Sequence, residues 1–589
     1  MRWQPRSFPD ETLVARLRAE LRLTPLSARL LAMRGITTPQ EAHRFLFPSF
    51  HHLHSPYDML GMRAAAERIG AALERREKVL IYGDYDADGT IAIVILKTAI
   101  ELCGGACEFH VPHRIREGYG MREDVIERAA AEGVRLIISV DTGIRAFAAA
   151  ETARRLGLDL IVTDHHLPQS GNLPPAFAVL NPNQPGCGYP CKALCGAGVA
   201  FKLAQALMEK CGRAELLPSF LKVVAIATVA DAVPLVGENR VFAKLGLDGL
   251  RQPVNLGLKA LMEVAQVAGG RALTAGEVAF RLAPRLNAAG RMDVAGEVIE
   301  LFSSRDPARA REIAAHLNQL NLERQQQEKR ILEEAETRIA ADAALRDAWC
   351  MVVDGEGWHK GVIGIAATRL VERYCRPVLV LTRDGLEAQG SARSIDSFDL
   401  LAALESCAHL FTRLGGHAHA AGFALPCARI PQLRTALEQR ARQCLRPQDL
   451  EPVLTYDGEL ALDEITAEFW AELCNMEPFG AGNPEPVFVA RRLRLLAPPR
   501  LVTDKHLKLR VGQPDSPLPN GAAPRAFDAL GWRMADRAAS LGPQEVLDLA
   551  FAIVDNPHPE FGGLQLSLWD FAKNTAGHSA IASDQSISS

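Results

Sequence analysis

The sequence predicts an α/β protein with a parallel-sheet domain, a long helix, a smaller α/β domain and a C-terminal β-barrel. Three observations support this fold class. Short apolar runs alternate with helical segments between residues 60 and 305, which is typical of a parallel sheet covered on both faces. Helix-forming residues continue without Pro or Gly through 308–345. Short strands separated by turns dominate from 447 to 570.

The length and composition indicate a multidomain protein without a membrane segment. A chain of 589 residues exceeds what one hydrophobic core usually organises. Hydrophobic residues make up 48% and charged residues 23%, and no window reaches the ~18 apolar residues that a membrane span requires. The amino terminus lacks a signal-peptide core, so we expect a cytoplasmic protein. The net charge of −4 gives no overall attraction to a polyanion, so any polyanionic partner must be bound by local basic strips.

The twelve cysteines are interpreted as reduced thiols, because they are scattered and no secretion signal accompanies them. Cys187, Cys191 and Cys195 recur every four residues. Prolines and glycines interrupt this segment, and no fourth ligand lies nearby. A closed structural zinc site needs four ligands, so we expect no metal there.

Three apolar runs at 78–82, 134–140 and 158–163 predict buried strands, and each one ends in polar residues. The segments that follow are DYD at 84–86, DTG at 141–143 and DHH at 164–166. The carboxyl ends of parallel strands meet at one edge of a sheet, where the ligand crevice lies. We therefore expect these acids and histidines to converge, although about 80 residues separate the first from the last.

The DYDADG segment at 84–89 places three carboxylates within five residues, which repel one another unless a cation or backbone donors hold them ionised. A calcium loop is disfavoured, because its twelfth position would be Ile95 and a strand precedes it. An acidic turn without a ligand stays open on this segment alone. Asp231 ends the apolar helical segment 220–233, so we expect a cation or a histidine beside it, with a helix cap as the alternative.

The candidate ligands are hard oxygens with one imidazole, a set that favours manganese or magnesium over zinc. Four acids carry enough charge for two ions, and such a centre hydrolyses phosphoesters. No Ser-His-Asp or activated-cysteine arrangement competes, so a covalent intermediate is not needed. This set comprises Asp84, Asp86, Asp141, His165 and Asp231.

Further segments carry candidate phosphate or strand contacts. The glycine-rich turn 195–201 matches neither a dinucleotide fingerprint nor a P-loop, so we favour close packing there over a phosphate nest. Residues 281–291 set three arginines and an asparagine around a turn, either a phosphate clamp or a solvated loop. The loops 390–394 and 415–422 suit phosphate oxygens. Residues 491–510 hold seven Lys or Arg against one Asp, as in a barrel that binds single strands.

The motifs at 84–89, 141–143, 164–166 and 230–231, in that order, resemble the four motifs of the DHH phosphoesterase superfamily. Gly415-Gly416-His417 looks like the signature of its associated DHHA1 domain. The resemblance covers nearly the whole chain. The 285–287 turn, the 390–394 loop, the segment 479–486 and the terminal barrel are together similar to the exonucleases of this superfamily that degrade single-stranded DNA.

This resemblance implies a 5′→3′ exonuclease that releases 5′-mononucleotides by two-metal-ion hydrolysis with Mn²⁺ or Mg²⁺, in DNA recombination and repair. Asp84, Asp86, Asp141, His165 and Asp231 would bind the ions, with Asp141 bridging them. Asp88 stays open between a direct ligand and a residue that only supports the ligands. Asp141, His165, His166 and Asp164 form the implied catalytic set, with His166 facing the scissile phosphate. Arg393 and His417 would hold the 5′ end. The full set of expected substrate contacts is Arg285, Asn287, Arg291, Ser391, Arg393, Gly415, Gly416, His417, Arg491, Arg492, Lys505 and Lys508.

The expected organisation follows from the same resemblance. Single-stranded DNA is the implied partner, together with a single-strand-binding protein and a helicase. We expect a bacterial, cytoplasmic monomer without membrane contact. The expected domains are an N-terminal helical lead-in (1–59), a DHH catalytic domain (60–305), a connecting helix (306–345), a DHHA1 substrate-binding domain (346–446), an OB-fold nucleic-acid-binding domain (447–570) and a disordered tail (571–589).

Two rival functions share the fold. A small-substrate DHH phosphoesterase, such as an oligoribonuclease or a cyclic-dinucleotide hydrolase, has the same metal centre but lacks a basic terminal barrel. A catalytically silent DHH subunit of a replication complex should have lost acids, whereas this chain retains each of them. Both features favour the exonuclease.

Overall fold

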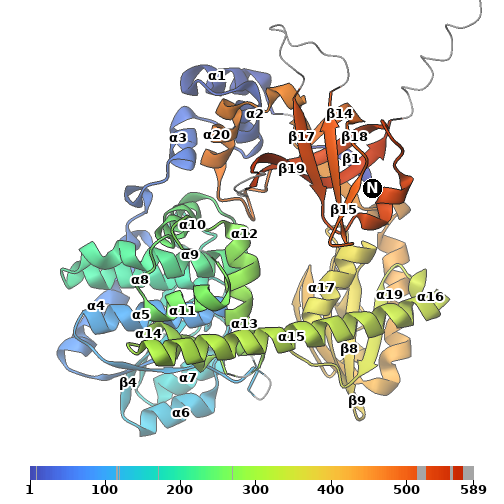
Figure 1. The fold of residues 1–589 in the computed structure, drawn as a ribbon. Helices are drawn as coiled ribbons and strands as arrows, with labels where there is room; N and C mark the ends of the chain where they lie inside the picture. The colour runs from blue at the N-terminus through green and yellow to red at the C-terminus, as the bar shows by residue number, and fades with distance from the viewer. Residues whose placement is uncertain are drawn as a thin grey trace, which may run out of the picture. The chain divides into compact units, whose positions relative to one another are not determined.

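The computed structural model describes residues 1–7, 9–114, 117–118, 120–169, 171–267, 269–292, 294–513, 525–556 and 562–574. The chain forms two compact units (Figure 1). The larger unit holds Pro48–Glu451 and Pro478–Gly482. The smaller unit holds Met1–Phe47, Pro452–Glu477 and Asn483–Ser589. The tail predicted to be disordered began at 571, but residues 571–573 belong to a strand, and from residue 575 onward the tail lies outside the described residues.

The first domain of the larger unit contains a parallel sheet in the order β3-β2-β4-β5-β6. The three predicted strands are β2 (Lys78–Tyr82), β4 (Val134–Val140) and β5 (Asp159–Thr163). The prediction missed two short outer strands, β3 (Cys107–His110) and β6 (Ala178–Leu180). Residues of β2 alternate between two apolar clusters, Val79 and Ile81 in one and Leu80 and Tyr82 in the other. Both faces are therefore covered, which explains the uninterrupted apolar runs.

Helices cover the two faces of this sheet unequally. The larger apolar cluster draws on α4 (Met62–Glu74), α5 (Ala87–Leu102), α8 (Gly196–Lys210) and α9 (Leu221–Ala230). It also takes in α10 (Gly237–Gly249), α11 (Leu256–Val264) and α14 (Gly296–Ser303). The opposite face packs on α6 (Glu123–Ala131) and α7 (Phe147–Arg155). The N-termini of α5 and α8 carry residues of the candidate site.

The segment 281–291, predicted to be a turn, is helical. A π-helical stretch, η4 (Val278–Leu282), follows the short α12 (Ala275–Glu277) and leads into α13 (Ala283–Arg291). Pro284 stands in the first turn of α13, directly after the π-helical stretch, so it lies inside a continuous helical segment. The turn prediction was therefore wrong, because the helical segment continues through this proline, with π-helical residues before it.

The long charged segment forms α15 (Pro307–Ala341), a single helix of 35 residues, and the short α16 (Ala343–Arg346) after it (Figure 1). Asp342 separates the two with extended backbone angles, and its side chain accepts a hydrogen bond from the Ala344 N–H. At 1.5 Å per residue, α15 measures roughly 52 Å. The predicted long helix is thus confirmed, with one break near its end.

The second domain of the larger unit has a mixed sheet in the order β10-β11-β9-β8-β7. β7 (Met351–Glu356) and β8 (Val378–Asp384) are parallel, and α17 (Ile363–Tyr374) connects them. β9 (Glu387–Arg393), β10 (Arg413–His417) and β11 (Ala420–Pro426) add antiparallel strands. Helices α18 (Leu400–Glu405) and α19 (Ile430–Cys444) complete the domain.

The two segments predicted to be phosphate-binding loops in this domain are largely strands. Residues 390–393 lie in β9, and 415–422 span the hairpin of β10 and β11. Ser391 pairs with Gly422, and Gly416 pairs with Ala421. Glycine-rich strands lack the apolar alternation from which strands are predicted, so only their partners reveal them.

The smaller unit combines N-terminal helices with C-terminal strands. β1 (Arg2–Pro5) pairs with β12 (Val453–Tyr456), and α1 (Glu11–Leu21), α2 (Pro25–Met33), α3 (Pro39–Leu46) and α20 (Ala467–Met476) accompany them. The other strands are β13 (Gly458–Glu459), β14 (Phe488–Leu495), β15 (Arg500–Val502), β16 (His506–Gly512), β17 (Ala526–Gly531), β18 (Val546–Asn556) and β19 (Gly563–Lys573). Pairing of β14 with β16 closes a ring through β18, β19 and β17.

Candidate metal centre and adjoining pockets

The first acidic pair follows β2. Asp86 caps α5, and its Oδ1 accepts hydrogen bonds from the N–H groups of Asp88 (2.9 Å) and Gly89 (3.1 Å). Asp84 is buried beside this turn. A Cβ on Gly89 would lie 2.7 Å from the Asp84 carbonyl oxygen, so glycine is required for the turn to close. The helix cap and the close turn hold both carboxylates at the end of β2.

Asp141 follows β4 in a strained conformation. Its φ of 57° lies in the left-handed region, where a non-glycine residue is uncommon. The side chain is buried against Gly196, at which a Cβ would lie 2.5 Å from the Asp141 carboxylate. Strain of this kind persists only where the surrounding structure imposes it, and it concentrates at functional sites.

The two histidines follow β5 and have different environments. Asp164 Oδ1 contacts His166 Nδ1 (2.7 Å), and Asp164 Oδ2 accepts the Ile144 N–H (2.9 Å). Burial opposes protonation of His166, but the Asp164 carboxylate outweighs it and raises the pKa of His166 to about 9. Burial lowers the pKa of His165 to about 4, aided by the neighbouring His166. His165 is therefore neutral at pH 7, as a metal ligand must be, and His166 is charged.

The acids and histidines of all four segments converge. His165 Nε2 lies 3.3 Å from Asp141 Oδ1 and 3.7 Å from Asp231 Oδ2 at the C-terminal end of α9. Three sets of ligand atoms lie within 4.8 Å of one another. They are Asp84, Asp86 and Asp141; Asp88, His165 and Asp231; and Asp141, His165 and His166. Asp141 and His165 each belong to two of these sets, and of the two only the Asp141 carboxylate has two oxygens to offer to two ions.

The donors fit a pair of divalent cations. Asp84 Oδ1, Asp141 Oδ1 and Asp231 Oδ2 are buried and accept no hydrogen bond from the residues that the structure describes. Burial, then the charge of neighbouring carboxylates, raises the pKa of Asp84 and of Asp231 to about 8. Such a cluster needs positive charge to stay ionised. Carboxylate oxygens with one imidazole suit Mn²⁺ or Mg²⁺. Among the described residues, no cysteine joins a convergent set of this kind.

The stability of the metal-free protein should fall as pH rises from about 6.5 to 8. In that window the native state holds protons on Asp84 and Asp231, with a pKa of about 8, and on His166, with a pKa of about 9, whereas the unfolded chain has released them. The melting temperature in EDTA should therefore drop across the window, and Mn²⁺ should restore it at pH 8. A melting temperature in EDTA that rises with pH would contradict this assignment.

Asp88 has a different environment from the other acids. Its Oδ2 accepts the Gly196 N–H (2.6 Å) and its Oδ1 accepts the Ala197 N–H (2.9 Å), so it caps α8 from 108 residues away. Burial, then Asp86, raises the pKa of Asp88 to about 7. The glycine-rich turn at 195–201 therefore holds a carboxylate of the chain itself, in close packing. Both oxygens of Asp88 are engaged, which favours a supporting role behind the ligands.

The contact between Gly196 and Asp141 gives a sharp test. The substitution Gly196→Ala should displace the Asp141 carboxylate and weaken Mn²⁺ binding by about 10- to 100-fold, as changes to the groups that orient a metal ligand do. Isothermal titration calorimetry measures the affinity. Gly198→Ala is the matched control in the same helical turn, because its Cβ would make only ordinary contacts of 3.4 Å or more. Equal Mn²⁺ affinities for the two variants would refute the positioning role of Gly196.

A basic pocket of about 360 Å³ lies beside the acidic cluster. Five cations line it against one acid, Glu372; the cations are Arg114, Arg291, Lys360, Arg369 and Arg393. Arg114 stacks over the Tyr85 ring at 4.9 Å, which places the pocket next to the DYDADG segment. Burial, then Arg114, lowers the pKa of Arg291 to about 10. The sequence prediction missed Arg114, Lys360 and Arg369, since single basic residues carry no pattern.

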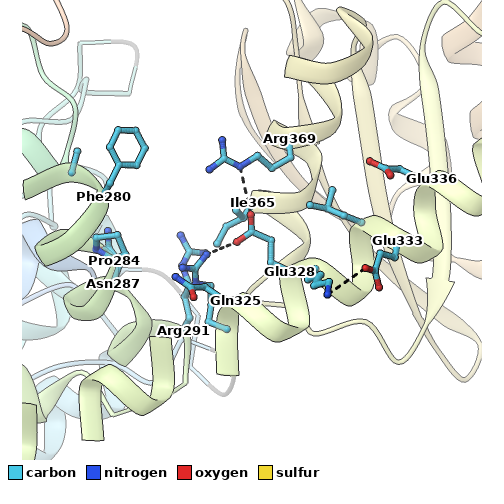
Figure 2. Close-up of a pocket in the computed structure, with 14 residues that line it drawn as sticks. Phe280, Pro284, Asn287, Arg291, Gln325, Glu328, Glu333, Glu336, Ile365 and Arg369 are labelled. Atoms are coloured by element: carbon cyan, nitrogen blue, oxygen red, sulfur yellow. Dashed lines mark hydrogen bonds and ion pairs between the residues drawn. The ribbon is translucent and has the colours of Figure 1, made fainter. Parts of the chain in front are cut away.

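A second pocket of about 560 Å³ lies between α13, α15 and α17 (Figure 2). Phe280 and Pro284 line one side of it, and Ile365 and Arg369 lie opposite. Arg291 lines both this pocket and the basic pocket. Asn287 also lines it, and its Oδ1 accepts the Ala87 N–H (2.9 Å). Asn287 therefore braces the start of α5, where the acidic cluster lies.

Other expected substrate contacts are dispersed. Arg285 Nε donates to Asn318 Oδ1 (3.0 Å), and Arg285 lines neither pocket. Ser391 lines the basic pocket, and its Oγ accepts from Arg393 (3.1 Å). Gly415, Gly416 and His417 are exposed on the β10–β11 hairpin. Burial, then His419 and Arg393, lowers the pKa of His417.

The basic strip of the smaller unit is partly neutralised. Arg491 pairs with Glu459 (3.0 Å) and Asp548 (3.1 Å), and Lys508 pairs with Asp528 (2.9 Å). Arg492 and Lys505 are exposed, and no ion pair joins either of them to another described residue. Fewer cations are therefore available to a nucleic acid than the sequence suggested.

Three family descriptions match successive parts of the chain. The DHH family, N-terminal domain, matches residues 78–228; the DHHA1 domain matches 347–443; and the RecJ OB domain matches 456–570. These matches agree with the predicted fold class, and the ring of strands in the smaller unit lies within the OB match. None of the helices in the described part of the chain has both the length and the hydropathy for a membrane span.

Several of the similar proteins carry the description single-stranded-DNA-specific exonuclease RecJ. The protein of Bacillus subtilis (strain 168) is 40% identical over 88% of this chain and 65% of its own length. That of Escherichia coli (strain K12) is 36% identical over 85% of this chain and 88% of its own length. The crystal structure of RecJ in complex with Mn²⁺ from Thermus thermophilus has a TM-score of 0.82 at 28% identity, covering 97% of this chain and 80% of that one.

Proposed function

Because the chain belongs to the RecJ family, we propose that it is a metal-dependent exonuclease that degrades single-stranded DNA from the 5′ end in recombination and repair. The observation that carries this proposal is the convergence of Asp84, Asp86, Asp141, His165 and Asp231 at one edge of the sheet. A catalytically silent relative has no reason to keep buried carboxylates that repel one another.

The metal centre sets the chemistry. When bound, two Mn²⁺ or Mg²⁺ ions polarise the phosphate and lower the pKa of water. Asp84 and Asp86 after β2 and Asp231 at the end of α9 would hold the ions, and Asp141, whose carboxylate has two oxygens, would be the ligand that both ions share. Asp164 fixes the ring of His166 through Nδ1, so the charged imidazole can stabilise the developing charge of the phosphate.

The basic pocket accounts for the direction of digestion. Arg114, Arg291 and Arg393 bind a terminal 5′-phosphate beside the acidic cluster, and Ser391 orients Arg393. Water attacks the phosphorus of the second nucleotide, and the bond to the 3′ oxygen of the first nucleotide breaks. A 5′-mononucleotide leaves, and the shortened strand carries a new 5′-phosphate, which the pocket binds in the next cycle.

The polarity of digestion tests this function. In Mn²⁺, the full chain should release mononucleotides from single strands, and a block at the 5′ end should stop it where a block at the 3′ end does not. EDTA should abolish digestion. Progressive shortening from the 3′ end, or faster turnover of dinucleotides than of long strands, would instead favour a small-substrate phosphoesterase.

The proposed setting of the enzyme rests on its bacterial relatives. We propose that the chain acts as a monomer in the bacterial cytoplasm, with a single-strand-binding protein and a helicase that supply single strands. Light scattering on the purified chain tests the oligomeric state. Stimulation of duplex digestion by a helicase tests the partnership.

A further inference from the structure

An aromatic pair with one exposed ring lies on the outer surface of the smaller unit. Trp532, just after β17, is 58% exposed, although tryptophan is usually well buried. Its ring contacts the ring of His506 in β16 edge to face, with 4.6 Å between the ring centroids. The Arg533 N–H donates to His506 Nδ1 (3.0 Å) and fixes the imidazole. The indole therefore has a firm support on one side and solvent on the other.

The strand register places basic residues on the same face. Val502 pairs with His506, and Arg500 pairs with Lys508. Side chains of directly paired residues lie on one face of a sheet, and so do those two positions apart. Leu507 and Leu509, which alternate with these positions, are buried inside the ring of strands. The outward face of β15 and β16 therefore presents Arg500, Val502, His506 and Lys508 beside Trp532.

Most of the cations around the aromatic pair are available to bind phosphates. Arg500, Lys505 and Arg533 are exposed, and within the described ranges none of them takes part in an ion pair. Lys508 shares Asp528 with Arg510, and Asp504 is the acid of the turn between β15 and β16. A backbone hydrogen bond joins that turn to the segment after Trp532, since the Ala535 N–H donates to the Lys505 carbonyl oxygen (3.3 Å).

We propose that Trp532, supported by His506, is a platform on which a base of single-stranded nucleic acid stacks, with Arg500, Lys505 and Arg533 binding the flanking phosphates. This inference rests on the proposed function and adds a contact far from the metal centre in the sequence. An aromatic face stacks on any base, and the cations match the backbone charge. A folded protein partner would gain little from a single ring surrounded by hydrated cations.

Binding in EDTA isolates this contact from digestion. The probe is oligo(dT) of about 30 nucleotides, longer than an OB-fold footprint of about 4–16. For the full chain, Trp532→Ala should raise the Kd about tenfold or more without changing its salt dependence, because stacking releases no counterions. Lys505→Ala should instead reduce the salt slope by about one ion. Trp532→Phe should keep most of the affinity.

Trp569→Ala is the matched control, because this tryptophan is 47% exposed on β19, in the same ring of strands. It should bind oligo(dT) like the wild type, and the melting temperatures should agree for all variants. Equal Kd values for Trp532→Ala and the wild type would overturn the stacking platform. The patch would then be assigned to a protein partner. Failure of the wild type to digest single strands in Mn²⁺ would overturn the proposed function separately.

Discussion

Replacing Asp141 by asparagine should lower the rate of single-strand digestion by about 10³-fold or more, because the variant lacks the charge shared by two ligand sets. Among neutral residues other than glycine, asparagine tolerates the left-handed backbone at this position best, so the turn after β4 should survive. The rate is measured with 5′-labelled oligonucleotides in Mn²⁺. Calorimetry should show weaker Mn²⁺ binding in parallel.

The matched control for this substitution is Asp159→Asn. Asp159 begins β5, at the amino-terminal edge of the sheet, and pairs with Arg68 (2.6 Å). Loss of this ion pair should lower the stability slightly and leave the rate of digestion almost unchanged. Wild-type digestion by Asp141→Asn, with the fold intact, would disprove the metal-centre assignment.

Replacing Arg393 by alanine should lower kcat/KM for 5′-phosphorylated strands by roughly 30- to 1,000-fold, as loss of one partner of a buried charge pair does. For strands with a 5′-hydroxyl, kcat/KM should fall far less, because they carry no terminal phosphate that the pocket could bind. Comparing the two substrates on one variant separates recognition of the phosphate from general damage to the site.

Arg373→Ala is a suitable control for the pocket. Arg373 lies on α17 in the same domain and pairs with Glu336, outside the basic pocket. The Arg373→Ala variant should digest both substrates at the rate of the wild type. If Arg393→Ala reduced digestion of both substrates equally, the pocket would not be the site that recognises the 5′-phosphate.

Local sequence determined the strands of the first sheet and the candidate ligands at their ends. β2, β4 and β5 are buried on both faces, so each appears as an uninterrupted apolar run. The short outer strands β3 and β6 escaped prediction, because 4 and 3 residues carry too little pattern. The glycine-rich strands of the second domain escaped it because their pairing is nonlocal.

Only the tertiary structure decided which candidates act together. On α13, Asn287 and Arg291 are four residues apart and share a face, whereas Arg285 points elsewhere. The backbone donors of α8 occupy both oxygens of Asp88, and distant acids neutralise Arg491 and Lys508. A residue's type and its place at a strand end are local properties of the sequence. Its hydrogen-bond and charge partners come from segments that folding brings together from far along the chain, which no local pattern encodes.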